Sequence, residues 1–350
     1  MKTTIFVVIL VFVVIACFIA AGVIAVTSNV FGNGWNLNIF NGEAKDMNVN
    51  MDKPLDLSGV EKVKIYMQVG DATVVPSQTS EAKVTGFVIG NPDRIVFDVQ
   101  KSGSELEITV KQVSGIFNFS IGSIALNVGL PADFKGDLEV SGATSKMTIG
   151  DFQLAGFKSR LTTGELTANI ASSGEVALES TTGRIVLNGK GRGYGNIRIR
   201  STTGSIEMSQ LTAGNIDCGS TTGRINLMDI KAAKITAGAT TGRIDITNCE
   251  GAVDARAMTG NISADLKSFQ ASYFETTTGG VSIKLPANAG FNLDARTTTG
   301  RVTTDYTFMG EVTGERKFSA GAEIKGSTNG GGQEIKIRTT TGSVEVLKGN

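Results

Sequence analysis

Apolar and polar residues alternate in short runs along the second half of the chain, and each run surrounds a glycine that directly follows Thr or Ser. After Gly183 these glycines are spaced by 21, 19, 19, 18, 19, 21 and 42 residues. The repeating unit is therefore about 19 residues long, and the last interval holds two units or one unit with an insertion. The ten glycines in this context are Gly164, Gly174, Gly183, Gly204, Gly223, Gly242, Gly260, Gly279, Gly300 and Gly342.

At most of these glycines, the residues two and four positions after the glycine are apolar, and so are those five and seven positions before it. The residues between them are mostly polar. This period of two predicts strands with one buried face, two strands to each unit. After the glycine we expect these residues to point inward: Ile185, Leu187, Ile206, Met208, Ile225, Leu227, Ile244, Ile246, Ile262, Ala264, Val281, Ile283, Val344 and Val346. Before it we expect the same of Val176, Leu178, Ile197, Ile199, Ile216, Cys218, Ile235, Ala237, Val253, Ala255, Leu293, Ala295, Ile335 and Ile337.

Two short strands cannot bury their faces alone, but successive units can do so by stacking as coils. The pattern therefore predicts an all-β, single-stranded β-solenoid (β-helix) with rungs of about 19 residues and Thr-Thr-Gly corners. Glycine tolerates the positive φ of a tight corner, and small hydroxyl residues can bond to neighbouring rungs. Nine of the glycines are assigned as structural corners: Gly164, Gly183, Gly204, Gly223, Gly242, Gly260, Gly279, Gly300 and Gly342.

The same pattern continues upstream, with inward positions Val63, Ile65, Ala72 and Val74 around Gly70, and Leu138, Val140, Met147 and Ile149 around Ser145. Between them lie irregular strand-like runs, such as "RIVFDVQ" and "ELEITVKQ", that predict irregular rungs or a capping sheet. We divide the chain into residues 1–27, a membrane segment; 28–59, a tether with loose first strands; 60–158, irregular N-terminal rungs or a cap; and 159–350, a regular solenoid with an irregular insertion at 305–333.

The N-terminal segment, residues 5–26, consists of 22 uncharged and mostly aliphatic residues, enough for one helix to cross a bilayer. No good Ala-x-Ala site follows it, which favours an uncleaved signal anchor over a cleaved signal peptide. Lys2 precedes it and no charge follows closely, which predicts a single-pass protein of the cell membrane with a cytoplasmic N-terminus and the rest of the chain outside. An alternative is a lipoprotein box at "VIAC", in which Cys17 would be lipidated.

Charge and composition narrow the function. Lys plus Arg and Asp plus Glu both number 33, so no field favours nucleic acid as a partner. The chain has no histidine, which removes the commonest acid/base group and metal ligand. Its three cysteines have no metal-type spacing; Cys218 falls in an inward slot and is expected to be a buried thiol, with a Cys218–Cys249 disulfide as the alternative. We predict no cofactor and no metal.

Outward positions directly after the corners form a basic stripe, Arg184, Arg224, Arg243 and Arg301, next to partly acidic positions. The stripe is a candidate site for an anionic glycan or wall polymer. The alternative is a solvated face whose stacked charges neutralise one another. A threonine array could also match an ice lattice, but here the threonines lie at a bend and arginine follows four of them.

Catalysis has one weak candidate. Glu207 and Asp245 lie two rungs apart, about 9 to 10 Å, near the upper end of the separation used by inverting glycosidases. No histidine, CxxC pair, phosphate-binding loop, dinucleotide motif or calcium nonapeptide accompanies them. We expect no catalytic residues and no enzyme.

An N-terminal membrane segment, then "VGDATVVPS", "SELEITV", "LNVGLPADF", "LEVSGATSKMTIGD", the "TTGRI" series and a Gly-rich break before "TTTGSVEV" together resemble a bacterial family of cell-surface proteins called "putative adhesins", a domain of unknown function. The resemblance covers about residues 60–350; Ser145 at a glycine position and Met258 at a threonine position depart from it. It implies a cell-surface β-solenoid and carries no catalytic residues.

Together these features predict a membrane-anchored, non-catalytic extracytoplasmic solenoid that acts in surface adhesion or binding, or as an envelope scaffold. The expected partners are the membrane and a wall polymer, glycan or surface protein. The alternatives are an envelope-stress sensor or regulatory partner, and a carbohydrate-active enzyme on a β-helix.

Overall fold

The computed structural model describes residues 44–46, 55–89, 94–113, 123–309 and 321–349. The chain divides into two compact units, Met1–Gly42 and Glu43–Asn350, and every described residue belongs to the second. The predicted membrane segment, residues 5–26, and Cys17 lie outside the described residues. Within the described ranges no helix is long and apolar enough to cross a membrane.

The described part of the chain is all-β, as the period-two pattern predicts. Its strands are β1 (Ala44–Asp46), β2 (Leu55–Asp56), β3 (Lys62–Ser77), β4 (Glu81–Ile89), β5 (Ile95–Ser102), β6 (Glu105–Gln112), β7 (Ser123–Pro131), β8 (Asp137–Leu154), β9 (Phe157–Ser172), β10 (Val176–Tyr194), β11 (Ile197–Thr203), β12 (Ile206–Thr222), β13 (Ile225–Thr241), β14 (Ile244–Thr259), β15 (Ile262–Phe269), β16 (Ser272–Thr278), β17 (Val281–Pro286), β18 (Phe291–Thr299), β19 (Val302–Thr304), β20 (Ala322–Thr328), β21 (Gln333–Thr341) and β22 (Val344–Gly349).

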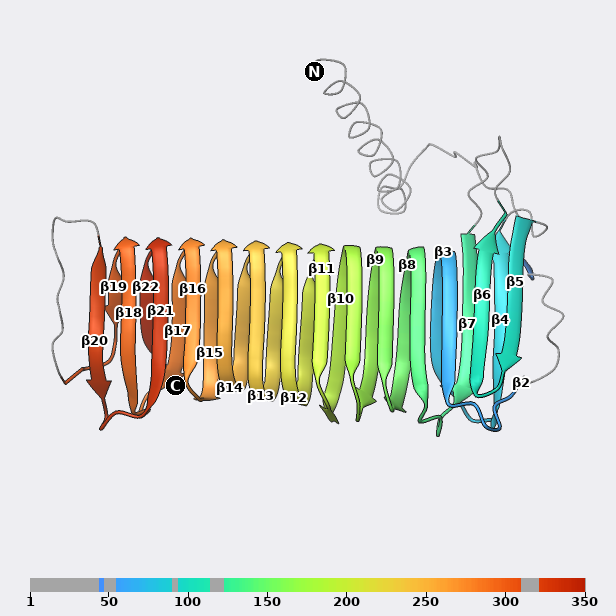
Figure 1. Ribbon diagram of the computed structural model, residues 1–350, viewed down its shortest axis with the longest axis horizontal. Helices are drawn as coiled ribbons and strands as arrows, with labels where there is room; N and C mark the ends of the chain where they lie inside the picture. The colour runs from blue at the N-terminus through green and yellow to red at the C-terminus, as the bar shows by residue number, and fades with distance from the viewer. Residues whose placement is uncertain (1–43, 47–54, 90–93, 114–122, 310–320, 350) are drawn as a thin grey trace, which may run out of the picture. The chain divides into compact units, whose positions relative to one another are not determined.

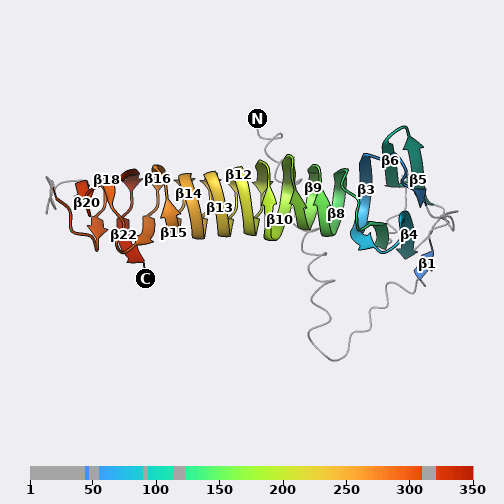
Figure 2. The same ribbon diagram turned by 90° about the horizontal axis from the view of Figure 1, so that it is seen from below.

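Successive coils stack in parallel, as in a β-solenoid, and Figures 1 and 2 show them as a row of flattened rungs. A strand such as β12 begins after one corner glycine, crosses a bend and continues to the next corner. Each coil therefore contributes to two sheets. We call the sheet built from the segments before the corner glycines, such as residues 216–222, the pre-corner sheet, and the sheet built from the segments after them, such as residues 225–229, the post-corner sheet.

The core lies between these two sheets. Every apolar residue predicted to point inward is at most 2 % exposed. In the post-corner sheet Ile225 is in register with Ile206 and Ile244 of the neighbouring coils, and in the pre-corner sheet Ile235 follows Ile216. The periodic apolar positions thus become continuous buried columns, and each coil is stabilised by the coils on both sides of it.

The nine assigned corner glycines have φ values between 140° and 154°. At Gly223 a Cβ atom would lie 1.9 Å from the carbonyl oxygen of Gly204 on the neighbouring coil, so the backbones are too close for any side chain. The residue three positions before the corner is buried, and the hydroxyl of Ser220 donates to that same Gly204 oxygen at 3.3 Å. Gly174, which shares the sequence context, follows β9 at the other end of the coil and does not have positive φ.

A second bend closes each regular coil, and the sequence pattern did not indicate it. Here Lys190, Gln210, Asp229 and Asn248 have φ between 49° and 58°, a left-handed conformation that is unusual for residues with side chains. Directly after three of them come the buried Leu211, Ile230 and Cys249. Cys218 and Cys249 are both free thiols and buried, so the alternative of a Cys218–Cys249 disulfide is wrong.

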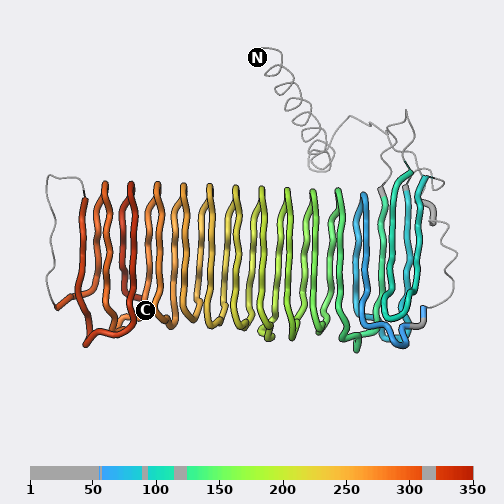
Figure 3. Tube along the Cα trace, viewed as in Figure 1, coloured from blue at the N-terminus to red at the C-terminus, as the bar shows by residue number. Residues whose placement is uncertain are grey.

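The ends of the stack do not follow chain order (Figure 3). At the C-terminal end, β21 lies between β16 and β18, and β22 lies between β17 and β19. At the N-terminal end, β3 lies between β8 on one side and β6 and β7 on the other. Antiparallel strands then cover edges of the outermost coils, β5 on β6, β4 on β7 and β20 on β18.

Candidate functional site

The predicted basic stripe is brought together only in part. Arg184, Arg224 and Arg243 begin nearby post-corner segments, with the coil of Ser205 between the first two. Arg301 lies four coils beyond Arg243, because the coils that begin with Asn261, Gly280 and Ser343 stand between them.

Three arginines of this stripe are paired with carboxylates of the same face. Arg184 Nε donates to Glu207 Oε1 at 3.0 Å, and this contact with Glu207 raises the pKa of Arg184. Arg243 Nε lies 2.5 Å from Asp245 Oδ1, and Arg224 Nε lies 3.8 Å from Asp245 Oδ2. This geometry matches the alternative interpretation of the stripe, a solvated face whose charges neutralise one another, and not a site with free positive charge for an anionic polymer.

These same pairs involve the two carboxylates considered for catalysis. Glu207 and Asp245 lie on either side of Asn226 in the register, so one coil separates them. Each accepts a hydrogen bond from an arginine at the exposed face. Both carboxylates are therefore engaged in ion pairs on the outward face.

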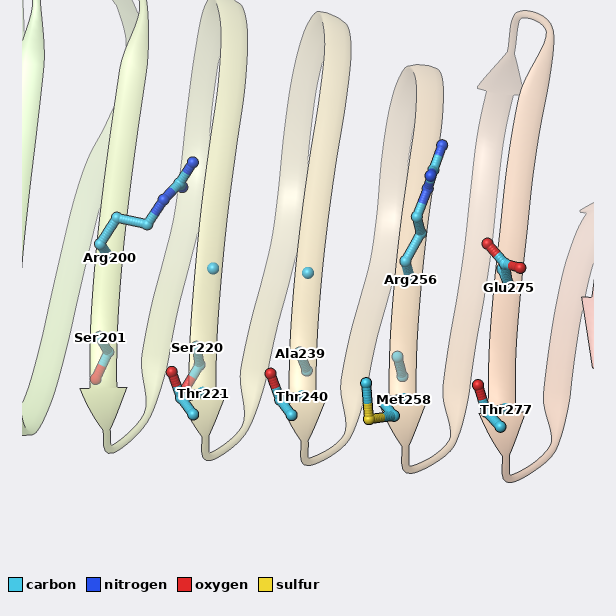
Figure 4. A pocket seen from close by; sticks show the side chains of 13 residues that line it. Arg200, Ser201, Ser220, Thr221, Ala239, Thr240, Arg256, Met258, Glu275 and Thr277 are labelled. Atoms are coloured by element: carbon cyan, nitrogen blue, oxygen red, sulfur yellow. The ribbon is translucent and has the colours of Figure 1, made fainter.

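The pre-corner sheet carries a groove that the sequence analysis missed (Figure 4). We call it the threonine groove; its volume is about 590 Å³, and it crosses five neighbouring coils. Gly219 and Gly238 stand four positions before their corners, where the flanking coils have Arg200 and Arg256. The groove is lined by Arg200, Ser201, Gly219, Ser220, Thr221, Gly238, Ala239, Thr240, Arg256, Ala257, Met258, Glu275 and Thr277.

An arginine stands on each side of the two glycines. Arg200 Nη1 donates to the carbonyl oxygens of Ile199 and Asp217 at 3.0 and 2.9 Å, and Nη2 bonds to the Asp217 carboxylate. Arg256 Nε and Nη2 donate to Asp254 at 2.7 and 3.1 Å. The Arg256 guanidinium also lies over the ring of Tyr273, 4.9 Å from its centroid. Ion pairs and stacking therefore hold both side chains in place.

One edge of the groove follows the corner. Thr221, Thr240, Met258 and Thr277 form a row there, one from each of four consecutive coils, as Figure 4 shows. All four are exposed, and Met258 departs from the threonine pattern with 60 % exposure. The row presents hydroxyl groups that repeat at the spacing of the coils, interrupted by one apolar side chain.

Two further hollows occupy the same outward face. One of about 470 Å³ shares Arg200, Ser201 and Thr221 with the threonine groove and extends to Arg160 and Glu179. Another, of about 370 Å³, lies near the N-terminal end around Tyr66, Lys111 and Glu139. The pre-corner sheet is thus a polar face with hollows along the stacking direction. The sequence signal that could have revealed the groove is a pair of outward glycines in consecutive coils, at a position where the neighbouring coils have long side chains.

The model of the family described as Toastrack DUF4097 matches residues 60–347. The chain belongs to this Toastrack family. The match covers nearly the same residues as the resemblance noted in the sequence, and it includes all the regular coils. No curated protein matches the chain.

Several solved structures are similar to this Toastrack chain at low identity. A "putative adhesin" from Parabacteroides distasonis is 12 % identical, with 87 % of this chain and 98 % of that chain covered and a TM-score of 0.45. A "putative lipid binding protein" from the same organism is 14 % identical, with 89 % and 97 % covered and a TM-score of 0.38. A "putative cell adhesion protein" from Clostridium sporogenes is 11 % identical, with 88 % and 100 % covered and a TM-score of 0.24.

Proposed function

We propose that this chain is a non-catalytic binding protein of the cell envelope, held in the membrane by residues 5–26, whose solenoid binds an extended polymer outside the cell. The observation that carries this proposal is the pre-corner sheet, where hollows lined by charged and hydroxyl side chains follow one another across consecutive coils. A surface that repeats at a fixed spacing suits a ligand that repeats as well.

The non-catalytic part of the proposal is supported by the charge pairs. The Glu207 and Asp245 carboxylates are held by arginines and lie on the post-corner sheet, away from the threonine groove. Within the described ranges, no group of three or more acidic or cysteine side chains is placed to hold a metal ion. The threonine groove itself is lined by arginine, serine and threonine side chains and by Glu275, which offer hydrogen bonds to a ligand.

Binding is tested with the full chain, purified in a detergent without a sugar headgroup and mixed with insoluble cell-wall polymers. We expect the chain to sediment with the polymer and the polymer to stay intact. The double variant Glu207→Gln, Asp245→Asn should bind equally well. Release of soluble sugars by the native chain but not by the double variant would contradict the proposal, and so would failure to sediment with any polymer.

Orientation is tested on intact cells with an added protease. Because Lys2 is the only charge before the apolar segment, we expect the protease to digest the solenoid from outside. The test is repeated after the wall and any outer membrane have been removed, and digestion that still requires opening of the cytoplasmic membrane would place the solenoid inside and contradict the envelope assignment.

A further inference from the structure

We propose that the threonine groove binds an uncharged glycan chain, which lies across the strands and parallel to the stacking direction of the coils. This inference rests on the proposed function, since it names the class of polymer and the place where it binds. It assigns binding to the pre-corner sheet, not to the arginine stripe of the post-corner sheet.

The shape of the groove gives the direction of its occupant. Its lining comes only from positions two to four residues before the corner of five coils; the three middle coils contribute all three positions and the two outer coils contribute two each. Neighbouring parallel strands lie about 4.8 Å apart, so the groove extends over about 19 Å along the stack. The occupant is therefore thin and extended. A glycan that lay in the groove would place about one sugar ring over each coil.

The space over the two glycines is free for a ring. A Cβ atom added to Gly238 would meet no atom within 4 Å, and one added to Gly219 would meet only the side chain of Arg200, at 3.5 Å or more. Neither glycine has positive φ, so the corner geometry does not require them. Their effect is to leave the face of the sheet open between Arg200 and Arg256.

The charge balance of the groove disfavours a polyanion. Arg200 is paired with Asp217 and Arg256 with Asp254, and Glu275 adds a further carboxylate to the lining. When the two aspartates, which are not part of the lining, are counted with the arginines that they pair, three carboxylates balance two guanidinium groups, so the groove has no excess of positive charge. An anionic polymer would gain little from such a surface, because its charges would meet as much repulsion as attraction.

The hydrogen-bonding groups fit sugar hydroxyls instead. A guanidinium has five N–H donors, and the bonds of Arg200 and Arg256 within the described residues leave donors free on both. Carboxylates accept, and threonine hydroxyls do both. A ligand whose hydroxyls both donate and accept can satisfy all three kinds of group, whereas an anion can only accept from them.

One other residue of the lining supports this choice. Met258 offers an apolar surface in the row of threonines, which suits the C–H face of a sugar ring.

The test uses the full chain in a detergent without a sugar headgroup, and measures its binding to uncharged hexasaccharides of glucose, mannose, galactose or N-acetylglucosamine and to anionic lipoteichoic acid. We expect at least one uncharged hexasaccharide to bind, with an affinity that changes less than about twofold between low and high salt, because few ions are released. The variant Gly238→Ile fills the groove and should weaken that binding at least tenfold.

The matched control is Gly193→Ile. Gly193 also lies in a strand, without positive φ and with no atom within 4 Å of an added Cβ, and it is outside the threonine groove. We expect its affinity to stay within about twofold of the native chain. Equal binding by Gly238→Ile, or no binding of any uncharged hexasaccharide, would overturn the groove assignment. If the chain then still binds wall polymer or lipoteichoic acid, the proposed function stands and only this inference fails.

Discussion

At the scale of single residues, the repeat contains two kinds of glycine, and the physical reason for having glycine differs between them. The corner glycines combine positive φ with a backbone contact that leaves no room for a Cβ atom. Gly219 and Gly238 meet neither restriction, and what they contribute is open space on the outward face. The sequence distinguishes the two kinds, because every assigned corner glycine directly follows Thr, whereas Gly219 follows Cys218 and Gly238 follows Ala237.

The corner restriction predicts the effect of adding one methyl group. Gly223→Ala should lower the free energy of unfolding by at least about 1 to 3 kcal/mol, the usual cost of one strained backbone position, because its Cβ would meet the Gly204 oxygen at positive φ. Gly238→Ala, in open space, should leave stability the same or slightly higher. Chemical denaturation of both variants checks this, and equal losses would show that the corner does not require glycine.

The buried thiols allow a second test. Burial raises the pKa of Cys218 to about 12 and that of Cys249 to about 11, so at pH 8 both are neutral thiols and poor nucleophiles. In a Cys17→Ser variant we expect a thiol reagent to label neither cysteine of the folded protein, and to label both after unfolding in guanidinium chloride. Rapid labelling of the folded protein at either position would show that its coil opens easily.

At the scale of strands and coils, the inward positions and the corners could be predicted from the sequence because each coil repeats the same constraint. The second bend could not, because its residue type changes from coil to coil. Asp229 and Asn248 are of types that tolerate a left-handed backbone, but Lys190 and Gln210 are not. The threonine groove was missed for a related reason, since an outward glycine has no side chain to mark its role.

The assignment of faces within a coil predicts a contrast inside β13. Ile225 is fully buried, and Met228, three residues later, is 42 % exposed. Ile225→Asp loses about 1.5 to 3 kcal/mol of burial and adds the desolvation of an unpaired carboxylate, which costs several more. Because a coil is stable only through its neighbours, several coils should unfold together.

Met228→Asp makes the same change on the outward face, between Ser209 and Thr247 of the neighbouring coils. It should cost less than about 1 kcal/mol, as surface substitutions usually do. Circular dichroism and limited proteolysis of both variants measure the contrast, with new cuts expected between about residues 200 and 250 for Ile225→Asp alone. Comparable damage from Met228→Asp would mean that the two faces are assigned wrongly.

At the scale of the whole stack, the two ends are built alike. The coil that contains β3 is the second from one end of the stack, and the coil formed by β21 and β22 is the second from the other end. Each of them is therefore paired with a coil on both sides. Arg338 of β21 bonds to the carbonyl and the carboxylate of Asp294 in β18, and Tyr306 donates to the Leu285 carbonyl at 2.8 Å. These bonds join segments that are distant in the sequence, and they pin the outermost coil to the stack.

This order at the C-terminal end could not be predicted from the sequence, because every coil carries the same corner and the same inward positions. It can be tested by engineered disulfides. Glu345 is in register with Ser282 on one side and with Thr303 on the other. Adjacent parallel strands lie about 4.8 Å apart, within the Cα range of a disulfide, and strands two coils apart lie about 9.6 Å apart, which is outside it.

We therefore expect the pair Ser282→Cys, Glu345→Cys to form a disulfide under mild oxidation, and the pair Ser282→Cys, Thr303→Cys to remain reduced. All three positions are on the outward face, where the substitutions leave the core unchanged. Mass spectrometry of proteolytic peptides identifies the bond, and the buried Cys218 and Cys249 should not take part. A disulfide between positions 282 and 303 would show that the coils stack in chain order, with β18 and β19 directly on β16 and β17, and would contradict the insertion of the last coil.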